Sequence, residues 1–349
     1  MTAPTESETL LEVTDLRTRF RTPAGTVRAV DGVSLTLDRG RTLGIVGESG
    51  SGKSVLSRSI MGLLPKRNVT CEGSIVYDGR EISSLPPAER RKLWGADMAM
   101  VFQDPMTALN PVIRIGRQIT EGLRFHLGLD RRTANENALA LLRSVGIPEP
   151  ERRMKQYPHE LSGGMRQRIM IAVALACGPK LLFADEPTTA LDVTVQAQIL
   201  NLLARQQRER NMAMVLVTHD LGVVAGRADD IAVMYAGQIV EKAPTATLFA
   251  NVRMPYTEAL LASIPKLDEP RRTRLKAIPG RPPSLIDPPP GCRFAPRCPY
   301  AQERCHREAP PLRESEPGHV YRCWYPVGVE PRRDGAADRT DTPTPTGAR

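Results

Sequence analysis

Hydrophobic positions along the first 250 residues follow two patterns. The segments LEVTDLRTRF (11–20) and VRAVDGVSLTL (27–37) alternate apolar and polar side chains, which predicts strands with one solvated face. Other runs are continuously apolar, as in strands that are buried on both faces of a mostly parallel sheet. These runs are TLGIVG (42–47), MAMVF (98–102), KLLFAD (180–185) and MAMVLVTH (212–219).

Helical patterns follow most of these apolar runs. They cover residues 52–64 and 193–210, and a longer stretch from 113 to 145 has helical periodicity alone. Strands that alternate with helices predict an α/β fold. Because the block from 113 to 176 lacks strong strand runs, we expect a helical subdomain inserted into the sheet.

Proline marks the boundaries between the predicted domains. Of the 31 prolines, 17 fall from Pro265 onward, where the helix and strand patterns fade. We therefore expect a larger α/β domain at 1–250, which contains the helical subdomain at about 104–178. A smaller C-terminal domain at 251–330 and a disordered tail at 331–349 complete the predicted organisation.

Composition excludes several classes of protein. Apolar residues make up 41% and charged residues 25% of the chain, which is typical of a folded protein and not of a disordered one. The net charge of +9 suits nucleic acid, an anionic membrane surface or a phosphate-rich ligand, and does not choose among them. No apolar stretch is long enough to span a bilayer, and the first residues lack a secretory pattern. We therefore expect the protein to lie in a reducing compartment, where its cysteines stay unpaired.

Residues 47–54, GESGSGKS, match the P-loop template G-x-x-x-x-G-K-[ST] between an apolar strand and a helix. Glycines let successive backbone N–H groups cradle phosphate oxygens at the helix N-terminus. Lys53 is predicted to reach the β- and γ-phosphates, and the Ser54 hydroxyl to ligate Mg²⁺. The alternative is a glycine-rich turn with an incidental lysine. The candidate phosphate-binding residues are Gly47, Glu48, Ser49, Gly50, Ser51, Gly52, Lys53 and Ser54.

A second candidate site element ends the apolar run at 180–185. Asp185 and Glu186 follow this buried strand, at the sheet edge where α/β proteins bind ligands. Asp185 is predicted to hold Mg²⁺, and Glu186 to polarise the attacking water. Adjacent carboxylates could instead cap a helix.

Between these elements lies LSGGM (161–165), and the run MAMVLVT is followed by His219. In this order the motifs closely resemble the ATPase subunits of ABC transporters over about residues 8–250. The resemblance implies an ATP-hydrolysing enzyme that uses ATP and Mg²⁺. It implies that Ser162, Gly163 and Gly164 contact the γ-phosphate that is bound by the opposite subunit.

Further roles are implied by the same resemblance. Gln103, in VFQDP, matches the loop glutamine that links Mg²⁺ to the helical subdomain, and His219 matches the switch histidine near the γ-phosphate. Asp192, after Ala190 and Leu191, matches a loop that communicates across the ATPase dimer. Phe20 is the best aromatic candidate for stacking on adenine, although it could equally be a core strand residue.

The C-terminal part narrows the resemblance. GCRFAPRCPYAQERC (291–305) and YRCWYP (321–326) resemble the extension of oligopeptide, dipeptide and nickel permease ATPases. Its cysteines follow the spacing C-x5-C-x6-C-x17-C, and we predict that they ligate one [4Fe–4S] cluster, with Zn²⁺ and free thiols as alternatives. These four residues are Cys292, Cys298, Cys305 and Cys323. Cys71 and Cys177 are expected to be ordinary buried residues.

The resemblance also implies the partners. They are two transmembrane permease subunits, a second ATPase subunit (identical or homologous) and an extracytoplasmic substrate-binding protein, with this chain at the cytoplasmic face of the membrane. An ABC ATPase that acts on DNA is a competing hypothesis, disfavoured because no coiled-coil insertion and no basic, aromatic-interleaved stretch is present. A P-loop kinase or GTPase is disfavoured by LSGGM and His219. We therefore expect peptide import and no nucleic-acid partner.

Overall fold

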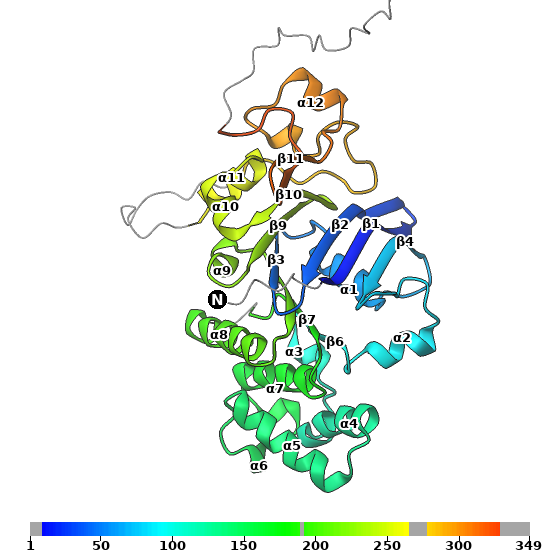
Figure 1. Ribbon diagram of the computed structural model, residues 1–349, viewed down its shortest axis with the longest axis vertical. Helices are drawn as coiled ribbons and strands as arrows, with labels where there is room; N and C mark the ends of the chain where they lie inside the picture. Colours follow the sequence, from blue (N-terminus) through cyan, green and yellow to red (C-terminus); the bar gives the residue numbers. More distant parts are fainter. Residues whose placement is uncertain (1–8, 189–191, 265–277, 329–349) are drawn as a thin grey trace, which may run out of the picture.

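The computed structural model describes residues 9–188, 192–264 and 278–328 (Figure 1). The predicted tail at 331–349 and the predicted dimer-contact residues Ala190 and Leu191 lie outside the described residues. Within these ranges, no helix is both long enough and apolar enough to cross a membrane.

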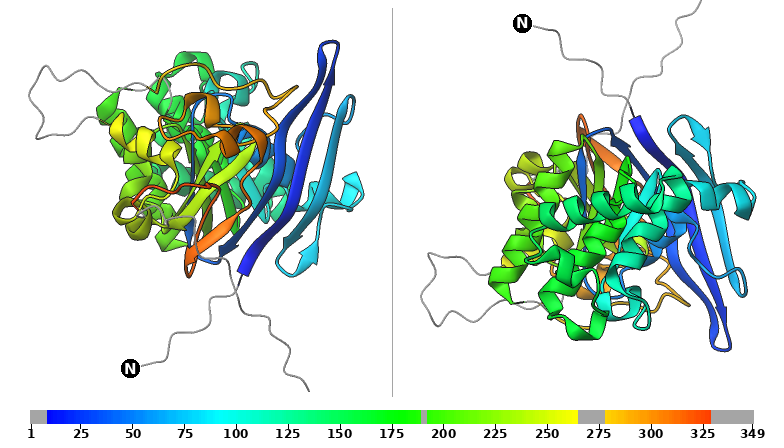
Figure 2. Two further views of the ribbon diagram at one scale, coloured as in Figure 1. Left: turned by 90° about the horizontal axis from the view of Figure 1, so that it is seen from above. Right: turned by 90° about the horizontal axis from the view of Figure 1, so that it is seen from below.

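A four-stranded antiparallel sheet with the order β2-β1-β4-β5 flanks one side of the molecule (Figure 2). Its strands are β1 (Thr9–Thr22), β2 (Gly25–Asp38), β4 (Val69–Tyr77) and β5 (Arg80–Glu81). Along β2, buried Val33, Leu35 and Leu37 alternate with more exposed residues. The alternation predicted for these two segments is therefore confirmed, because one face of the sheet covers the core.

The described strands also form an eight-stranded sheet with the order β11-β12-β10-β9-β3-β8-β7-β6. Its strands are β3 (Thr42–Val46), β6 (Met98–Val101), β7 (Leu181–Asp185), β8 (Ala213–Thr218), β9 (Asp230–Tyr235), β10 (Gln238–Pro244), β11 (Arg313–Glu316) and β12 (His319–Tyr321). The neighbours from β9 to β6 run parallel, and every residue of β3, β6, β7 and β8 is buried. The four continuous apolar runs are thus strands buried on both faces, as predicted.

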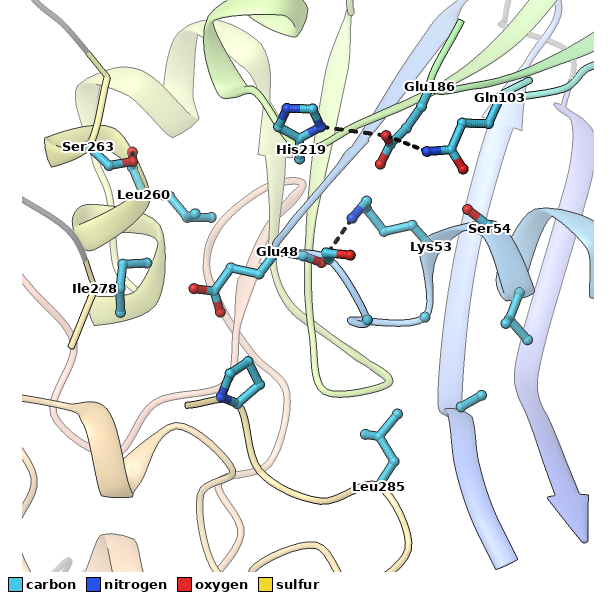
Figure 3. Close-up of a pocket in the computed structure, with 16 residues that line it drawn as sticks. Glu48, Lys53, Ser54, Gln103, Glu186, His219, Leu260, Ser263, Ile278 and Leu285 are labelled. Carbon is cyan, nitrogen blue, oxygen red and sulfur yellow. Dashed lines mark hydrogen bonds and ion pairs between the residues drawn. The ribbon is translucent and has the colours of Figure 1, made fainter. Parts of the chain in front are cut away.

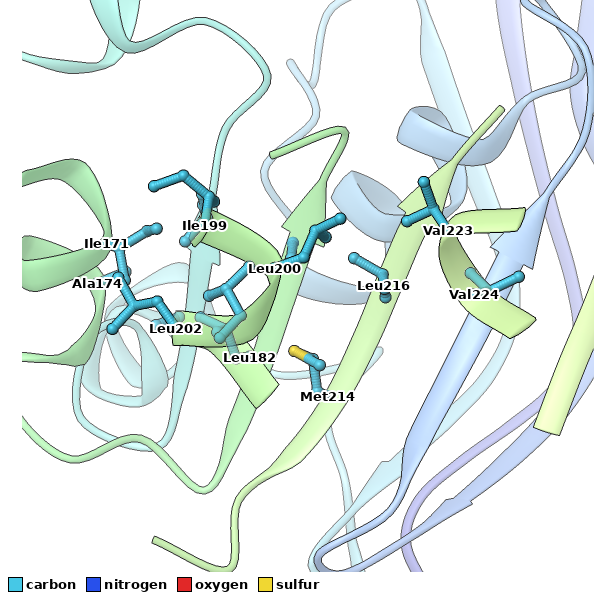
Figure 4. Packing of buried hydrophobic residues seen from close by; sticks show 14 of the residues in the cluster. Ile171, Ala174, Leu182, Ile199, Leu200, Leu202, Met214, Leu216, Val223 and Val224 are labelled. Atoms are coloured by element: carbon cyan, nitrogen blue, oxygen red, sulfur yellow. The ribbon is translucent and has the colours of Figure 1, made fainter. Parts of the chain in front are cut away.

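Helices cover this sheet (Figure 4). Leu182 of β7 and Leu216 of β8 pack in one apolar cluster with Ile171, Leu200 and Val224 from three helices. Across all described residues, the helices are α1 (Lys53–Met61), α2 (Pro87–Leu93), α3 (Pro105–Ala108), α4 (Ile115–Leu127), α5 (Arg131–Ser144), α6 (Pro150–Arg153), α7 (Gly163–Leu175), α8 (Val193–Glu209), α9 (Leu221–Ala225), α10 (Thr245–Ala250), α11 (Pro255–Ala262) and α12 (Glu303–Arg307), with 3₁₀ turns η1 (Pro158–Glu160) and η2 (Ala295–Arg297).

Helices α4 to α7 gather at one end of the long axis, and the C-terminal segment 278–328 lies at the other (Figure 1). The four helices fall within the predicted subdomain at 104–178. Their apolar faces, which include Ile119, Leu142 and Ile169, are continuous with the core beneath the parallel sheet. The helical block is therefore anchored by packing as well as by its chain connections.

The C-terminal segment is built onto the ATPase sheet. Strand β12 pairs with β10, and the Leu285 carbonyl accepts a hydrogen bond of 2.9 Å from the Arg28 N–H of β2. Tyr235, Tyr256 and Phe294 form an aromatic cluster with ring centroids 4.5–5.4 Å apart. These contacts place the C-terminal segment 278–328 against the strands that flank the P-loop.

Candidate functional site

The P-loop lies between the end of β3 and the start of α1. Gly47 and Gly52 have φ values of 156° and 101°. A Cβ at Gly47 would collide with the Met234 carbonyl oxygen, and one at Gly52 with the Ala29 carbonyl oxygen. Glycine is thus required at both positions, because the loop turns closely against β9 and β2.

Lys53 begins α1 and is almost fully buried. Its Nζ donates hydrogen bonds to the carbonyl oxygens of Gly47 at 2.7 Å and Glu48 at 2.9 Å. Burial lowers the pKa of Lys53, while the nearby carboxylates of Glu186, Asp185 and Glu48 act in the opposite direction. The ammonium group is therefore held inside the loop that is predicted to receive phosphates.

Ser54 and Asp185 bring two oxygen donors together beside the P-loop. The Ser54 hydroxyl donates to Asp185 Oδ1 at 2.8 Å, although the residues are far apart in sequence. Asp185 is fully buried, and its Oδ2 has no hydrogen-bond partner among the described residues. Burial raises the pKa of Asp185, opposed by the Ser54 hydrogen bond. A buried carboxylate oxygen without a partner, next to a hydroxyl, fits a hard cation such as Mg²⁺.

Three further side chains meet above Lys53 (Figure 3). Gln103 Nε2 donates to Glu186 Oε2 at 3.1 Å, and His219 Nδ1 lies 3.6 Å from the same oxygen. Glu186 has a φ of 46°, and its N–H donates to the Val217 carbonyl. Because β6, β7 and β8 are parallel neighbours, their carboxyl ends bring these residues to one edge of the sheet.

A pocket of about 910 Å³ lies at this edge. P-loop residues, Gln103, Glu186 and His219 form its polar side. Further lining residues, which sequence reasoning did not predict, lie in or directly after α11 and in the C-terminal segment (Figure 3). They are Leu260, Ser263, Ile278, Pro282 and Leu285. No motif marks them, because single residues outside the nucleotide-binding motifs carry no signal of their own for nucleotide binding.

Other predicted residues lie outside this pocket. Ser162 caps α7 by accepting the Met165 N–H at 3.4 Å, and Gly163 and Gly164 form the first turn of that helix. Asp192 caps α8 in the same way. Phe20 lies on β1, paired with Val27 and Val69, and is not among the pocket-lining residues.

The four C-terminal cysteines line one small cavity near α12. Burial raises the pKa of the Cys323 thiol to about 12 and that of Cys298 to about 11. Within the described ranges, no group of three or more His, Cys, Asp or Glu residues is arranged as a metal site, so the cluster stays a prediction. Cys71 is exposed and Cys177 half-buried, so the expectation that both are buried was wrong. Cys71 lies on β4 of the flanking sheet, which has one solvated face.

Comparisons with known proteins agree with this geometry. A family model described as "ABC transporter" matches residues 30–189, and one described as "Oligopeptide/dipeptide transporter, C-terminal region" matches residues 240–305. The oligopeptide transport ATP-binding protein OppD of Salmonella typhimurium is 51% identical over 93% of this chain and 96% of its own length. The dipeptide transport ATP-binding protein DppD of Bacillus subtilis is 49% identical over 91% of this chain and 95% of its own length.

Solved structures extend the comparison to the fold. A dimeric ATP-binding cassette bound to ADP and Pi superposes with a TM-score of 0.61 at 27% identity, covering 68% of this chain and 99% of that chain. Fold and site together define a P-loop ATPase of the ABC-transporter class, as the motif order had indicated. Within that class, the chain belongs to the family of ATP-binding subunits of oligopeptide and dipeptide ABC transporters.

Proposed function

We propose that this chain is the ATP-hydrolysing motor subunit of an importer that moves di- or oligopeptides across the cytoplasmic membrane. The proposal rests on two features that occur together in this chain, a P-loop site and a peptide-transporter segment. A P-loop site with Gln103, Glu186 and His219 in contact shares its pocket with Ile278 and Leu285 of the segment matched by the peptide-transporter model. Residues 1–250 would be the ATPase domain, and 251–330 its peptide-transporter extension.

Nucleotide binding follows from the polar side of the pocket. P-loop N–H groups and the α1 N-terminus favour the phosphates, and Lys53 supplies the cation that contacts their β- and γ-groups. Ser54 and Asp185 would hold Mg²⁺, with Gln103 as a further oxygen donor. When bound, Mg²⁺ neutralises charge on the phosphates.

Hydrolysis is assigned to the residues at the ends of β6, β7 and β8. Glu186 accepts a hydrogen bond from the attacking water and orients it toward the γ-phosphate. Gln103 and His219, which both contact the Glu186 carboxylate, hold that carboxylate in place. His219 also stabilises charge on the γ-phosphate.

The base of the nucleotide is placed against the apolar wall of Ile278, Pro282 and Leu285. These residues share the pocket with Ala29 and the P-loop, whereas Phe20 does not line it. An apolar wall suits the faces of a purine ring. Adenine recognition would thus depend on the C-terminal segment.

A second ATPase subunit, identical or homologous, would complete each site. Ser162, Gly163 and Gly164 cap α7 outside this chain's own pocket, so their N–H groups are available to a nucleotide held by a partner. Asp192 lies at the start of α8, also outside the pocket. The related cassette described above is dimeric, which supports the same arrangement.

Docking to two transmembrane permease subunits is assigned to the region that follows Gln103. Met106, Val112 and Phe125 are large apolar side chains that remain exposed there. Exposed apolar residues mark interaction surfaces when they gather in one region. This docking would place the chain at the cytoplasmic face of the membrane, with an extracytoplasmic binding protein that delivers the peptide to the permeases.

A structural [4Fe–4S] cluster is proposed at the cysteine cavity. All four cysteines line it, together with Phe294 and Trp324, so the four candidate ligands surround one cavity. When bound, the cluster would cross-link this proline-rich segment. Zn²⁺, which takes four sulfurs at about 2.3 Å from one ion, remains the alternative. Among the described residues no metal-binding group is preformed for either one, so this observation does not choose between them.

The experiment is to co-express the chain with its candidate permeases and ATPase partner, purify the membrane complex and measure ATP hydrolysis. We expect hydrolysis to rise when peptide and the binding protein are added. A complex that carries Glu186→Gln is the control for contaminating ATPases. Stimulation by DNA, or none by peptides, would contradict the proposal.

A further inference from the structure

The P-loop is held by a residue outside every nucleotide-binding motif. The guanidinium of Arg297, in the C-terminal segment, donates to both carboxylate oxygens of Glu48, from Nη1 at 2.6 Å and from Nη2 at 2.9 Å. The side chain of Arg297 is 3% exposed. The Glu48 N–H also donates to the Tyr256 hydroxyl at 2.9 Å, so side chain and backbone of one loop residue are both anchored.

Arg297 has little freedom to move. Its Nε donates to the Pro279 carbonyl at 2.8 Å, while Nη1 also reaches the Tyr235 hydroxyl and Nη2 the Ile278 carbonyl. The five N–H groups of a guanidinium can thus all be engaged. The hydrogen bond to Glu48 raises the pKa of Arg297 above its ordinary value, so the charge is permanent.

This contact matters for anion binding because Glu48 lines the same pocket as Lys53 and Ser54. Without a cation beside it, the Glu48 carboxylate would repel a bound polyphosphate. This repulsion would be strong because the site is partly desolvated. Arg297 neutralises that charge and keeps the carboxylate turned toward the C-terminal segment. Nucleotide affinity therefore depends on a residue that does not touch the phosphates.

Arg297 is also placed between two of the cavity-lining cysteines. It ends η2, a turn in which the Cys292 carbonyl accepts the Ala295 N–H at 3.0 Å and the Cys298 N–H donates to the Ala295 carbonyl at 3.3 Å. Both thiols line the cavity described above. A change that moves either cysteine must move the turn that carries the guanidinium.

We infer that Arg297 is a positioning residue of the nucleotide site, which acts through Glu48. Through Arg297, nucleotide affinity is coupled to the conformation of the turn between Cys292 and Cys298. The inference rests on the proposed nucleotide-binding function and goes beyond it, because it assigns a regulatory link to the C-terminal segment. By reciprocity, bound nucleotide would also favour the observed arrangement of the turn.

The test compares ATP affinities of purified full-length variants by calorimetry. Arg297→Gln should bind ATP about tenfold more weakly, as expected for one uncompensated charge close to the phosphates. Adding Glu48→Gln should recover part of the loss, because it removes the repelling carboxylate. A structural role alone would not be rescued by this second change.

Arg293→Gln is the matched control. Arg293 forms a buried ion pair with Asp31 of β2 across the same interface, and neither residue lines the pocket. We expect that variant to lower stability and to weaken ATP binding much less than Arg297→Gln does, although Arg293 lies in the same turn. Equal affinity losses in the two arginine variants, or no loss in Arg297→Gln, would overturn the positioning role.

Coupling to the cysteine turn is tested by a double-mutant cycle with Cys298→Ser. This change should weaken ATP binding in the wild-type background and have a much smaller effect when Arg297 is already Gln. Additive effects would refute the coupling. If the wild-type chain itself fails to bind ATP, or Lys53→Ala binds it equally well, the proposed nucleotide-binding function is wrong instead.

Discussion

The side-chain amide of Gln103 donates a 3.1 Å hydrogen bond to the carboxylate of Glu186, which joins the loop after β6 to the end of β7. Gln103 also stands immediately before the helices of the inserted subdomain, whose first member α3 begins at Pro105. The residue that we propose to orient the attacking water is therefore in contact with the proposed hinge to the region assigned to permease docking.

Replacing Glu186 with Gln should stop turnover and preserve ATP binding. The amide keeps the shape of the side chain but loses the negative charge that orients water, so we expect at least a ~100-fold fall in kcat. Phosphate release and ATP binding measure the two effects separately. Glu136→Gln, on an exposed face of α5, is the control. Near-normal hydrolysis by Glu186→Gln would show that another group orients the attacking water.

Gln103→Ala should separate ATP binding from transport. The variant loses the hydrogen bond to Glu186 but leaves the P-loop contacts of Lys53 intact. We expect ATP affinity, measured without Mg²⁺, within about twofold of wild type and peptide uptake reduced several-fold, because the signal to the helical subdomain is weakened. Uptake by reconstituted vesicles is the measurement. Unchanged uptake would count against the hinge role.

Asp185→Asn should stabilise the protein while it weakens Mg²⁺ binding. Burial raises the pKa of Asp185, so its ionised form is less favourable in the folded than in the unfolded state. The wild type thus loses stability as pH rises above the ordinary aspartate pKa, and the loss is complete above the raised pKa. We expect the variant to be more stable than wild type at neutral pH, and the difference to shrink on acidification.

Denaturant unfolding without nucleotide or metal, at several pH values, measures this gain. Asp38→Asn, on β2, serves as a carboxylate control whose side chain is not fully buried. A pH-independent difference between wild type and Asp185→Asn would mean that the carboxyl titrates alike in both states.

The role of Leu285 in binding the adenine base can be compared with that of Phe20. Leu285→Ala should weaken ATP binding about fivefold, because it removes apolar contact with the base. Inorganic triphosphate lacks a base, so its binding should stay the same. If Phe20→Ala causes the larger loss for ATP, adenine stacks on β1 as the family resemblance implied.

Cys298→Ser should remove bound metal from the C-terminal segment, whereas Cys177→Ser should not, since Cys177 is not among the residues that line that cavity. The measurement is iron, acid-labile sulfide and zinc in anaerobically purified protein. Iron with sulfide supports the cluster, and zinc alone supports the alternative. Protein that holds neither would leave the four cysteines as free thiols.

The ATPase core could be predicted from sequence because each part is a local signal. A buried strand in a parallel sheet is a continuous apolar run, as in β3, β7 and β8, and the P-loop needs glycines at fixed positions. Parallel strands also end at the same edge. The order of the motifs alone therefore predicts that Lys53, Glu186 and His219 lie close together.

Tertiary structure alone decided what surrounds those residues. The pairing of β12 with β10 brings the C-terminal segment back to the P-loop, and the contact between Arg297 and Glu48 spans most of the chain. No periodicity or motif encodes such a contact, because it depends on packing between segments that are distant in sequence. No motif distinguishes Leu285 from Phe20 as a pocket residue. Only the fold determines that Leu285 lines the pocket and that Phe20 does not.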